Sequence, residues 1–92
     1  MILIGEKLNG FIPPVGRAIR ARDEETLRAL ARAQADGGAD YLDLCTGPDC
    51  EPEAETLAWL VRLIEETVDI PVCLDSANPE TLAAVLPLCK RP

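Results

Sequence analysis

One stretch decides the fold: Val72-Cys73-Leu74-Asp75-Ser76-Ala77-Asn78-Pro79, an apolar run that ends abruptly in a carboxylate. A small polar turn follows the acid, and the Asn-Pro pair that closes the stretch is typical of a helix N-terminus. A buried strand that carries an acid at its carboxyl end is how α/β proteins build ligand sites. Two earlier stretches repeat the plan, Ile2-Leu3-Ile4-Gly5-Glu6 and Tyr41-Leu42-Asp43-Leu44.

Three short strands are predicted around these acids, over residues 2–5, 40–44 and 70–74. The first is a continuous apolar run, which is typical of a sheet buried on both faces. Glycine and proline residues predict a loop over residues 6–16. A short helical turn is expected over residues 17–22.

Three helices are predicted from apolar residues that recur with a helical period. Asp23 is a suitable N-cap for the first helix, which Gly37-Gly38 should end. Pro52 suits the first turn of the second helix, and Asn78 is the N-cap candidate of the third. The residues expected to form the buried stripes are Leu27, Leu30, Ala31 and Gln34; Leu57, Leu60, Val61, Ile64 and Val68; and Leu82, Val85, Leu86 and Cys89.

The predicted order is β-α-β-α-β-α, which favours a parallel sheet with right-handed crossovers. A complete eight-stranded barrel needs about 250 residues, so a chain of 92 residues has room for roughly three of its eight units. The sequence therefore predicts an α/β fold, the N-terminal part of a TIM (β/α)8 barrel, as one incomplete domain over residues 1–92. Its open sheet edge is expected to pair with another copy in a homodimer.

Composition narrows the range of partners and compartments. The net charge of −7 disfavours nucleic acid, which needs a cationic surface. No apolar run approaches the roughly 18 residues of a membrane span, so no membrane association is expected. The four cysteines lack the spacing of a metal site, and histidine is absent. With no basic leader, we expect a cytoplasmic protein with free thiols.

The strand-end acids suggest a ligand site. In a barrel all strand ends open to the same mouth, so Glu6, Asp43 and Asp75 should converge there, with Asn9 and Asn78 nearby. Carboxylates and amides suit a ligand rich in N–H donors, such as the amino-pyrimidinone edge of a pterin. The same acids could instead bind a divalent cation, although no metal ligand is assigned.

Purely structural roles for these residues stay open at this point. A carboxylate after a strand often caps the next turn, which would account for Asp43 or Glu6. Asn9 precedes a glycine, as turn residues do. For Asp75 the ligand role is favoured, because Asn78 already supplies a helix cap.

Three motifs, at residues 5–10, 37–44 and 73–78, resemble the N-terminal part of methyltetrahydrofolate methyltransferases. These are pterin-binding barrels that pass a methyl group between tetrahydrofolate and a corrinoid protein. The resemblance implies that Asp75 contacts the pterin and that Glu6, Asn9 and Asp43 line the same pocket. It also implies methyltetrahydrofolate or tetrahydrofolate as the pterin substrate, and cobalamin carried by a partner protein.

The resemblance implies a displacement at the methyl carbon, in which cobalt(I) attacks the N5-methyl group or the methyl moves the opposite way. The amine leaving group then needs a proton or a strong hydrogen bond near N5. No catalytic residue is assigned, because the family's remaining pterin contacts lie on later strands. Cys45 stands where many family members carry asparagine.

Two alternatives remain beside this one. A dihydropteroate synthase uses the same scaffold, but in that family Asn-x-Thr-Pro-Asp-Ser-Phe follows the first strand, where this chain has Lys7-Leu8-Asn9-Gly10-Phe11. The other alternative is a non-catalytic βα fragment, or a subunit that completes a barrel with a partner chain.

Overall fold

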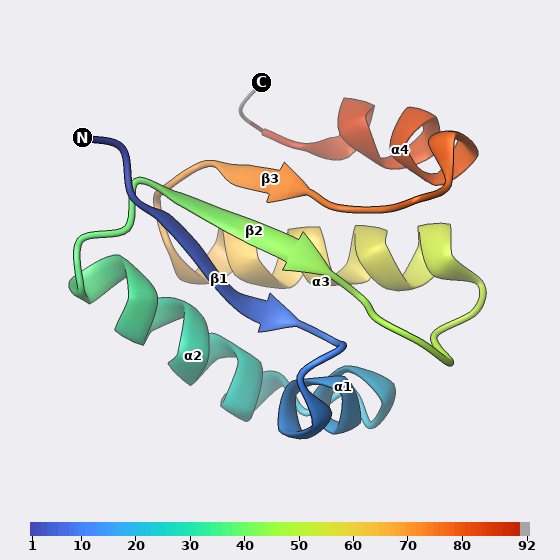
Figure 1. The fold of residues 1–92 in the computed structure, drawn as a ribbon, viewed down its shortest axis with the longest axis horizontal. Helices are drawn as coiled ribbons and strands as arrows, with labels where there is room; N and C mark the ends of the chain where they lie inside the picture. Colours follow the sequence, from blue (N-terminus) through green and yellow to red (C-terminus); the bar gives the residue numbers. More distant parts are fainter. Residues whose placement is uncertain (91–92) are drawn as a thin grey trace.

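The three acid-bearing stretches form neighbouring strands of one parallel sheet (Figure 1). A computed structural model describes residues 1–90 of the chain. In it β1 (Ile4–Asn9) pairs with β2 (Tyr41–Cys45), and β2 pairs with β3 (Val72–Leu74), both in parallel. The predicted α/β fold with parallel strands is confirmed for this part of the chain.

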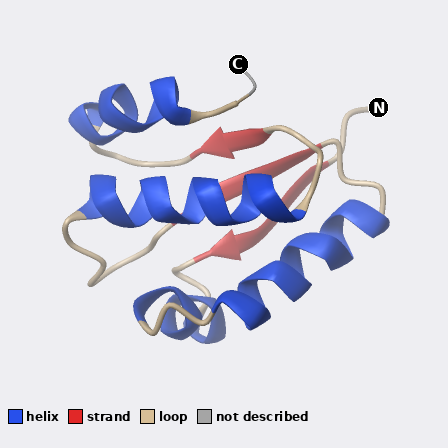
Figure 2. Ribbon diagram, turned by 180° about the vertical axis from the view of Figure 1, so that it is seen from behind, coloured by secondary structure: helices blue, strands red, loops and turns tan. Residues whose placement is uncertain are grey.

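The helices lie on one side of that sheet. They are α1 (Pro13–Arg20), α2 (Glu24–Asp36), α3 (Glu53–Thr67) and α4 (Pro79–Val85), which a 3₁₀ turn, η1 (Leu86–Leu88), follows. Strand β2 passes in front of α3 in Figure 1 and behind it in Figure 2, which is seen from the opposite side. The other face of the sheet carries no helix within residues 1–90. No helix among these residues is long and apolar enough to cross a membrane.

The core lies between the sheet and the helices. Leu42 and Leu44 of β2 are fully buried, whereas the residues between and beside them are only half-buried. This alternation is the period of two of a strand with one covered face. The helical residues that pack into the same core are Val15, Ala18, Ile19, Leu27, Ala31, Leu57, Leu60, Val61, Leu63, Ile64 and Val85. Most of the predicted stripes are therefore confirmed.

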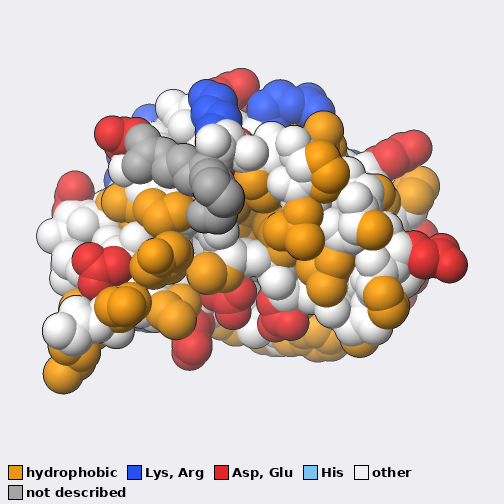
Figure 3. All heavy atoms as spheres, turned by 90° about the horizontal axis from the view of Figure 1, so that it is seen from above, with side chains coloured by type: hydrophobic (Ala, Val, Ile, Leu, Met, Phe, Trp, Pro, Cys, Tyr) orange, Lys and Arg blue, Asp and Glu red, His pale blue; other side chains and the backbone are white. Residues whose placement is uncertain are grey.

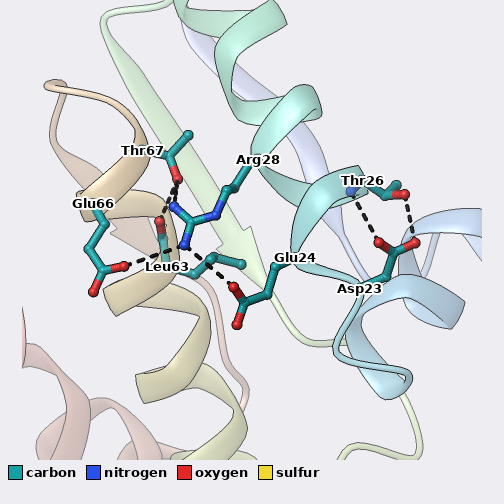
Figure 4. A network of polar contacts seen from close by, with 7 residues as sticks. All are labelled: Asp23, Glu24, Thr26, Arg28, Leu63, Glu66 and Thr67. Atoms are coloured by element: carbon teal, nitrogen blue, oxygen red, sulfur yellow. Dashed lines mark hydrogen bonds and ion pairs between the residues drawn. The ribbon is translucent and has the colours of Figure 1, made fainter.

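The helix starts follow the predicted capping chemistry. The Asp23 carboxylate accepts hydrogen bonds from the Thr26 backbone N–H at 3.2 Å and from the Thr26 hydroxyl at 2.7 Å (Figure 4). Asn78 caps α4 by accepting from the Glu80 N–H at 3.0 Å. Pro52 occupies the N-cap of α3, one position earlier than predicted. Gly38, just after α2, has a φ of +98°, a conformation that glycine adopts without strain.

Polar contacts join α2 to α3 on the outer side of the fold. Arg28 of α2 donates to the Thr67 hydroxyl of α3 at 2.8 Å and pairs with Glu24 and Glu66 at 3.5 Å each (Figure 4). The Arg22 guanidinium stacks over the Trp59 ring at 4.4 Å from its centre. These contacts fix the helix layer behind the sheet.

The first strand differs from its prediction. β1 begins and ends later than residues 2–5, because its pairing with β2 continues through a bulge between Gly5 and Leu8. The backbone N–H of Lys7, inside that bulge, is satisfied by the Gln34 side chain at 3.0 Å. The prediction of a strand buried on both faces was wrong for this part of the fold. Ile4 is 50% exposed, because nothing covers the second face within the described residues.

Other helix and strand boundaries also differ from the predicted ones, because they depend on contacts in the folded chain. α1 begins at Pro13 rather than at Arg17, because prolines in the first helical turn replace N–H groups that have no partner there. β3 is confined to Val72–Leu74, the residues in register with β2, although backbone hydrogen bonds to β2 also involve Pro71 and Asp75. Leu86, predicted to be buried, is 57% exposed. Helix α4 ends just before it and tightens into a 3₁₀ turn that contains Pro87.

Candidate functional site

The uncovered face of the sheet carries the chemistry. Leu42 and Leu44 point to the helices, so their neighbours Asp43 and Cys45 point to the opposite face. Parallel pairing places Cys73 of β3 beside Asp43, and Asn9 of β1 beside Cys45. Side chains from three strands thus form two polar rows on one surface.

The three predicted acids meet on this surface, but only Asp75 follows its strand. Glu6 and Asp43 lie within β1 and β2, so the prediction that all three stand at strand ends was wrong. Asp75 directly follows β3, and its N–H donates to the Leu44 carbonyl at 2.9 Å, so the pairing continues one residue beyond the strand. Glu6 lies in the bulge of β1 next to the point where Asp43 projects. Burial raises the pKa of the Asp43 carboxyl, and the negative charges of Asp75 and Glu6 raise it further. The acids therefore lie within electrostatic reach of one another.

The two asparagines near the site are engaged in local turns. The Asn9 amide oxygen accepts from the Phe11 N–H at 2.9 Å, which is a turn-forming contact. Asn78 caps α4, and the exposed Asp75 does not. The structure thus gives Asn9 the turn role that the sequence left open. Asn9 also pairs with Cys45, which is the last residue pair between β1 and β2. The structure leaves the Asp75 carboxylate without a capping role.

Two cysteines lie among the acids. The sequence pointed to Cys45 only through its place in the family motif, and it gave Cys73 no role in the site. Burial raises the pKa of Cys45, although a backbone hydrogen bond from Gly47 opposes this; the charges of Asp75, Asp43 and Glu53 add to the increase. Burial and then Asp43 raise the pKa of Cys73. Both side chains are half-buried, unpaired thiols. The alternation of side chains along a strand predicts this placement, because it puts both cysteines on the same face of the sheet as Asp43.

A close backbone contact holds the carboxyl ends of β1 and β2 together. The Gly10 N–H donates to the Cys45 carbonyl at 2.8 Å. A Cβ added at Gly10 would overlap the Thr46 carbonyl, and one added at Gly47 would overlap Gly10. The two loops that border the acid face can therefore approach this closely only because both positions are glycine.

A hollow in the described part of the chain lies beside this site rather than over it. Its volume is about 560 Å³, and it runs along the free edge of β1 against α2. Glu6 and Lys7 border it, but most of its lining is apolar. We place the candidate site on the acid face, because that surface holds the convergent polar groups that ligand recognition needs. Among residues 1–90, no three histidine, cysteine or acidic side chains are grouped to hold a metal ion.

Comparison with known proteins bears on the resemblance seen in the motifs. No protein-family model matches the chain. The chain is 52% identical, over all 92 of its residues, to a methylcorrinoid:tetrahydrofolate methyltransferase from Eubacterium limosum. The match covers 34% of that protein, so the chain spans about a third of its relative's length. The predicted resemblance is confirmed.

Proposed function

We propose that this chain, related over its whole length to a methylcorrinoid:tetrahydrofolate methyltransferase, is the pterin-binding part of an enzyme of that activity. The enzyme would move the N5-methyl group between methyltetrahydrofolate and the cobalt of a corrinoid protein. The observation that carries the proposal is the gathering of Glu6 of β1, Asp43 of β2 and Asp75, directly after β3, on the uncovered face of three adjacent parallel strands. Asp75 stands at the carboxyl edge of the sheet, which is where α/β enzymes bind their ligands.

The fold supports completion as a barrel. Three strands in sequential order, with all helices on one side, are what the first three units of a TIM (β/α)8 barrel require. In the closed barrel the uncovered face becomes the interior, and the free edges of β1 and β3 pair with further strands. We therefore assign residues 1–92 to a pterin-binding domain that continues beyond them.

The acid face suits the pterin ring. Its amino-pyrimidinone edge offers adjacent N–H groups, and a carboxylate accepts such groups in charge-assisted hydrogen bonds. Asp75 is assigned this contact, because it is exposed on the open face and no capping role occupies it. Asp43, Asn9 and Glu6 complete this side of the pocket. Ligand donors would also relieve the mutual repulsion of the three acids.

The chemistry divides between the chain and its partner. The corrinoid supplies the cobalt that takes or gives the methyl group, and the residues of this chain bind and orient the pterin. A corrinoid protein is accordingly the proposed partner. A homodimer and a cytoplasmic location are further proposals, which light scattering and cell fractionation would test.

Calorimetric titration of the full-length protein with methyltetrahydrofolate tests the function. Loss of one charged hydrogen bond is worth about 1.5–3 kcal/mol, so Asp75→Asn should weaken binding by about tenfold to a hundredfold. Asp36→Asn is the matched control, because Asp36 is exposed at the end of α2, and its affinity should equal that of the wild type. A wild-type protein with no folate affinity would refute the function. Unchanged affinity in Asp75→Asn would refute the assignment of the contact.

A further inference from the structure

Glu53, the first residue of α3, ties that helix to the segment that follows β3. Its Oε2 accepts a hydrogen bond from the Ser76 hydroxyl at 2.9 Å, and its Oε1 accepts from the Thr81 hydroxyl at 2.8 Å. Thr81 is buried, and Glu53 and Ser76 are half-buried. Both oxygens of one carboxylate are therefore committed to partners 23 and 28 residues further along the chain.

The hydrogen bond between Glu53 and Ser76 lies directly beside Asp75. Ser76 is the next residue, and its hydroxyl oxygen also accepts from the Asn78 N–H at 3.0 Å, which fixes the turn into α4. On the other side, the Asp75 N–H is bound to the Leu44 carbonyl at 2.9 Å. The backbone that presents the Asp75 carboxylate is thus held from two directions, by β2 and, through Ser76, by Glu53.

The sheet alone gives this turn little support. β3 has three residues, compared with six in β1 and five in β2. A loop after so short a strand needs side-chain contacts to fix its conformation. A carboxylate that accepts from two hydroxyls in a partly buried setting supplies them, because charge-assisted hydrogen bonds are the stronger kind.

We infer that Glu53 is a positioning residue, which sets the affinity of the site for folate by fixing the turn that carries Asp75. The inference rests on the proposed pterin contact of Asp75. The role assigned to Glu53 acts through the Ser76 and Thr81 hydroxyls that its two oxygens bind, not through a direct contact with the ligand. Displacing a binding group by about 1 Å is enough to reduce its effect by a large factor.

The test is a double-mutant cycle on methyltetrahydrofolate affinity in the full-length protein. Glu53→Ala should raise the dissociation constant by about tenfold. Glu53→Gln, which keeps one acceptor oxygen and the side-chain volume, should have a smaller effect. Glu55→Ala removes the same charge from an exposed position on the same helical turn and should bind like the wild type.

Repeating the Glu53 substitution in the Asp75→Asn variant separates a positioning role from general destabilisation of the protein. If Glu53 acts through Asp75, then Glu53→Ala should add little further loss when Asp75 is already asparagine. An equal loss in both backgrounds, or wild-type affinity in Glu53→Ala beside a weakened Asp75→Asn, would overturn the positioning role alone. Wild-type affinity in Asp75→Asn would overturn the pterin contact and the positioning role together. Should Glu53→Ala fail to fold, Glu53→Gln carries the same comparison.

Discussion

Replacing Gly10 with alanine tests whether the loops after β1 and β2 must touch. Gly10 is buried, and its N–H is bound to the Cys45 carbonyl at 2.8 Å. The new Cβ would overlap the Thr46 carbonyl and lie 2.9 Å from the Gly47 nitrogen. These neighbours are backbone atoms, so no side-chain rotation can relieve the overlap. One loop must therefore move away from the other.

The cost should be near the top of the range for overpacking. Extra methyl groups in packed sites typically cost 1–3 kcal/mol, and separating the loops also strains a backbone hydrogen bond of about 1 kcal/mol. We expect Gly10→Ala to lower the free energy of unfolding by about 3 kcal/mol. Urea unfolding of the full-length protein measures this as a lower midpoint with an unchanged slope.

Gly38 provides the control for backbone effects. Its φ is +98°, but a Cβ there would meet nothing within 4 Å. Gly38→Ala should therefore cost only the conformational strain, about 1–2 kcal/mol. A cost for Gly10→Ala within about 0.5 kcal/mol of zero, or one smaller than that for Gly38→Ala, would refute the reasoning about loop contact.

Three further predictions concern charged side chains. Burial, and then the charges of Asp75 and Glu6, raise the pKa of Asp43 above its ordinary value of 3.8. Protonated Asp43 therefore stabilises the folded state below pH 3.8, and this contribution is lost as the pH rises through the raised pKa. Asp43→Asn should therefore stabilise the protein at pH 7 relative to the wild type but not at strongly acidic pH, as urea unfolding at both would show. The pKa of Asp23 is lowered by the Thr26 hydroxyl and then by the Thr26 N–H, so its contribution is present above 3.8 and lost as the pH falls through the lowered value. Asp23→Ala should destabilise the protein at neutral pH and progressively less on acidification, and a pH-independent effect would contradict the capping contact. Glu66→Ala should lower the free energy of unfolding by less than about 0.5 kcal/mol, because its ion pair with Arg28 is half-exposed. Arg28→Ala should lower it by about 1 kcal/mol, because the hydrogen bond to Thr67 is lost as well. Thermal unfolding of the two variants side by side checks this order.

Features governed by local chemistry were predictable from the sequence. Asp23 and Asn78 cap helices because their side chains reach N–H groups two or three residues away. The gathering of Glu6, Asp43 and Asp75 was predicted, but its cause differs. Glu6 and Asp43 lie within β1 and β2, and pairing of neighbouring parallel strands brings them together on the uncovered face. The proposed pterin ligand rests on the resemblance to a known family as well.

Features that depend on distant partners were not predictable. β1 continues through Asn9 because Gln34 satisfies the N–H of Lys7, 27 residues away in sequence. The pairing that extends the strand also buries Leu8 opposite Leu44. Glu53 looked like an ordinary acid in the first turn of a helix, and only the folded chain brings Ser76 to it. No spacing rule links residues that far apart.

The alternation along β2 has a consequence for how such a site can diversify. Leu42 and Leu44 face the helices and set the packing volume, while Asp43 and Cys45 face the open surface and set its chemistry. A change at position 43 or 45 alters hydrogen bonding and charge toward a ligand with little effect on the buried layer. Substitutions that change ligand preference can therefore accumulate on one face of a strand while the residues on its other face preserve the fold.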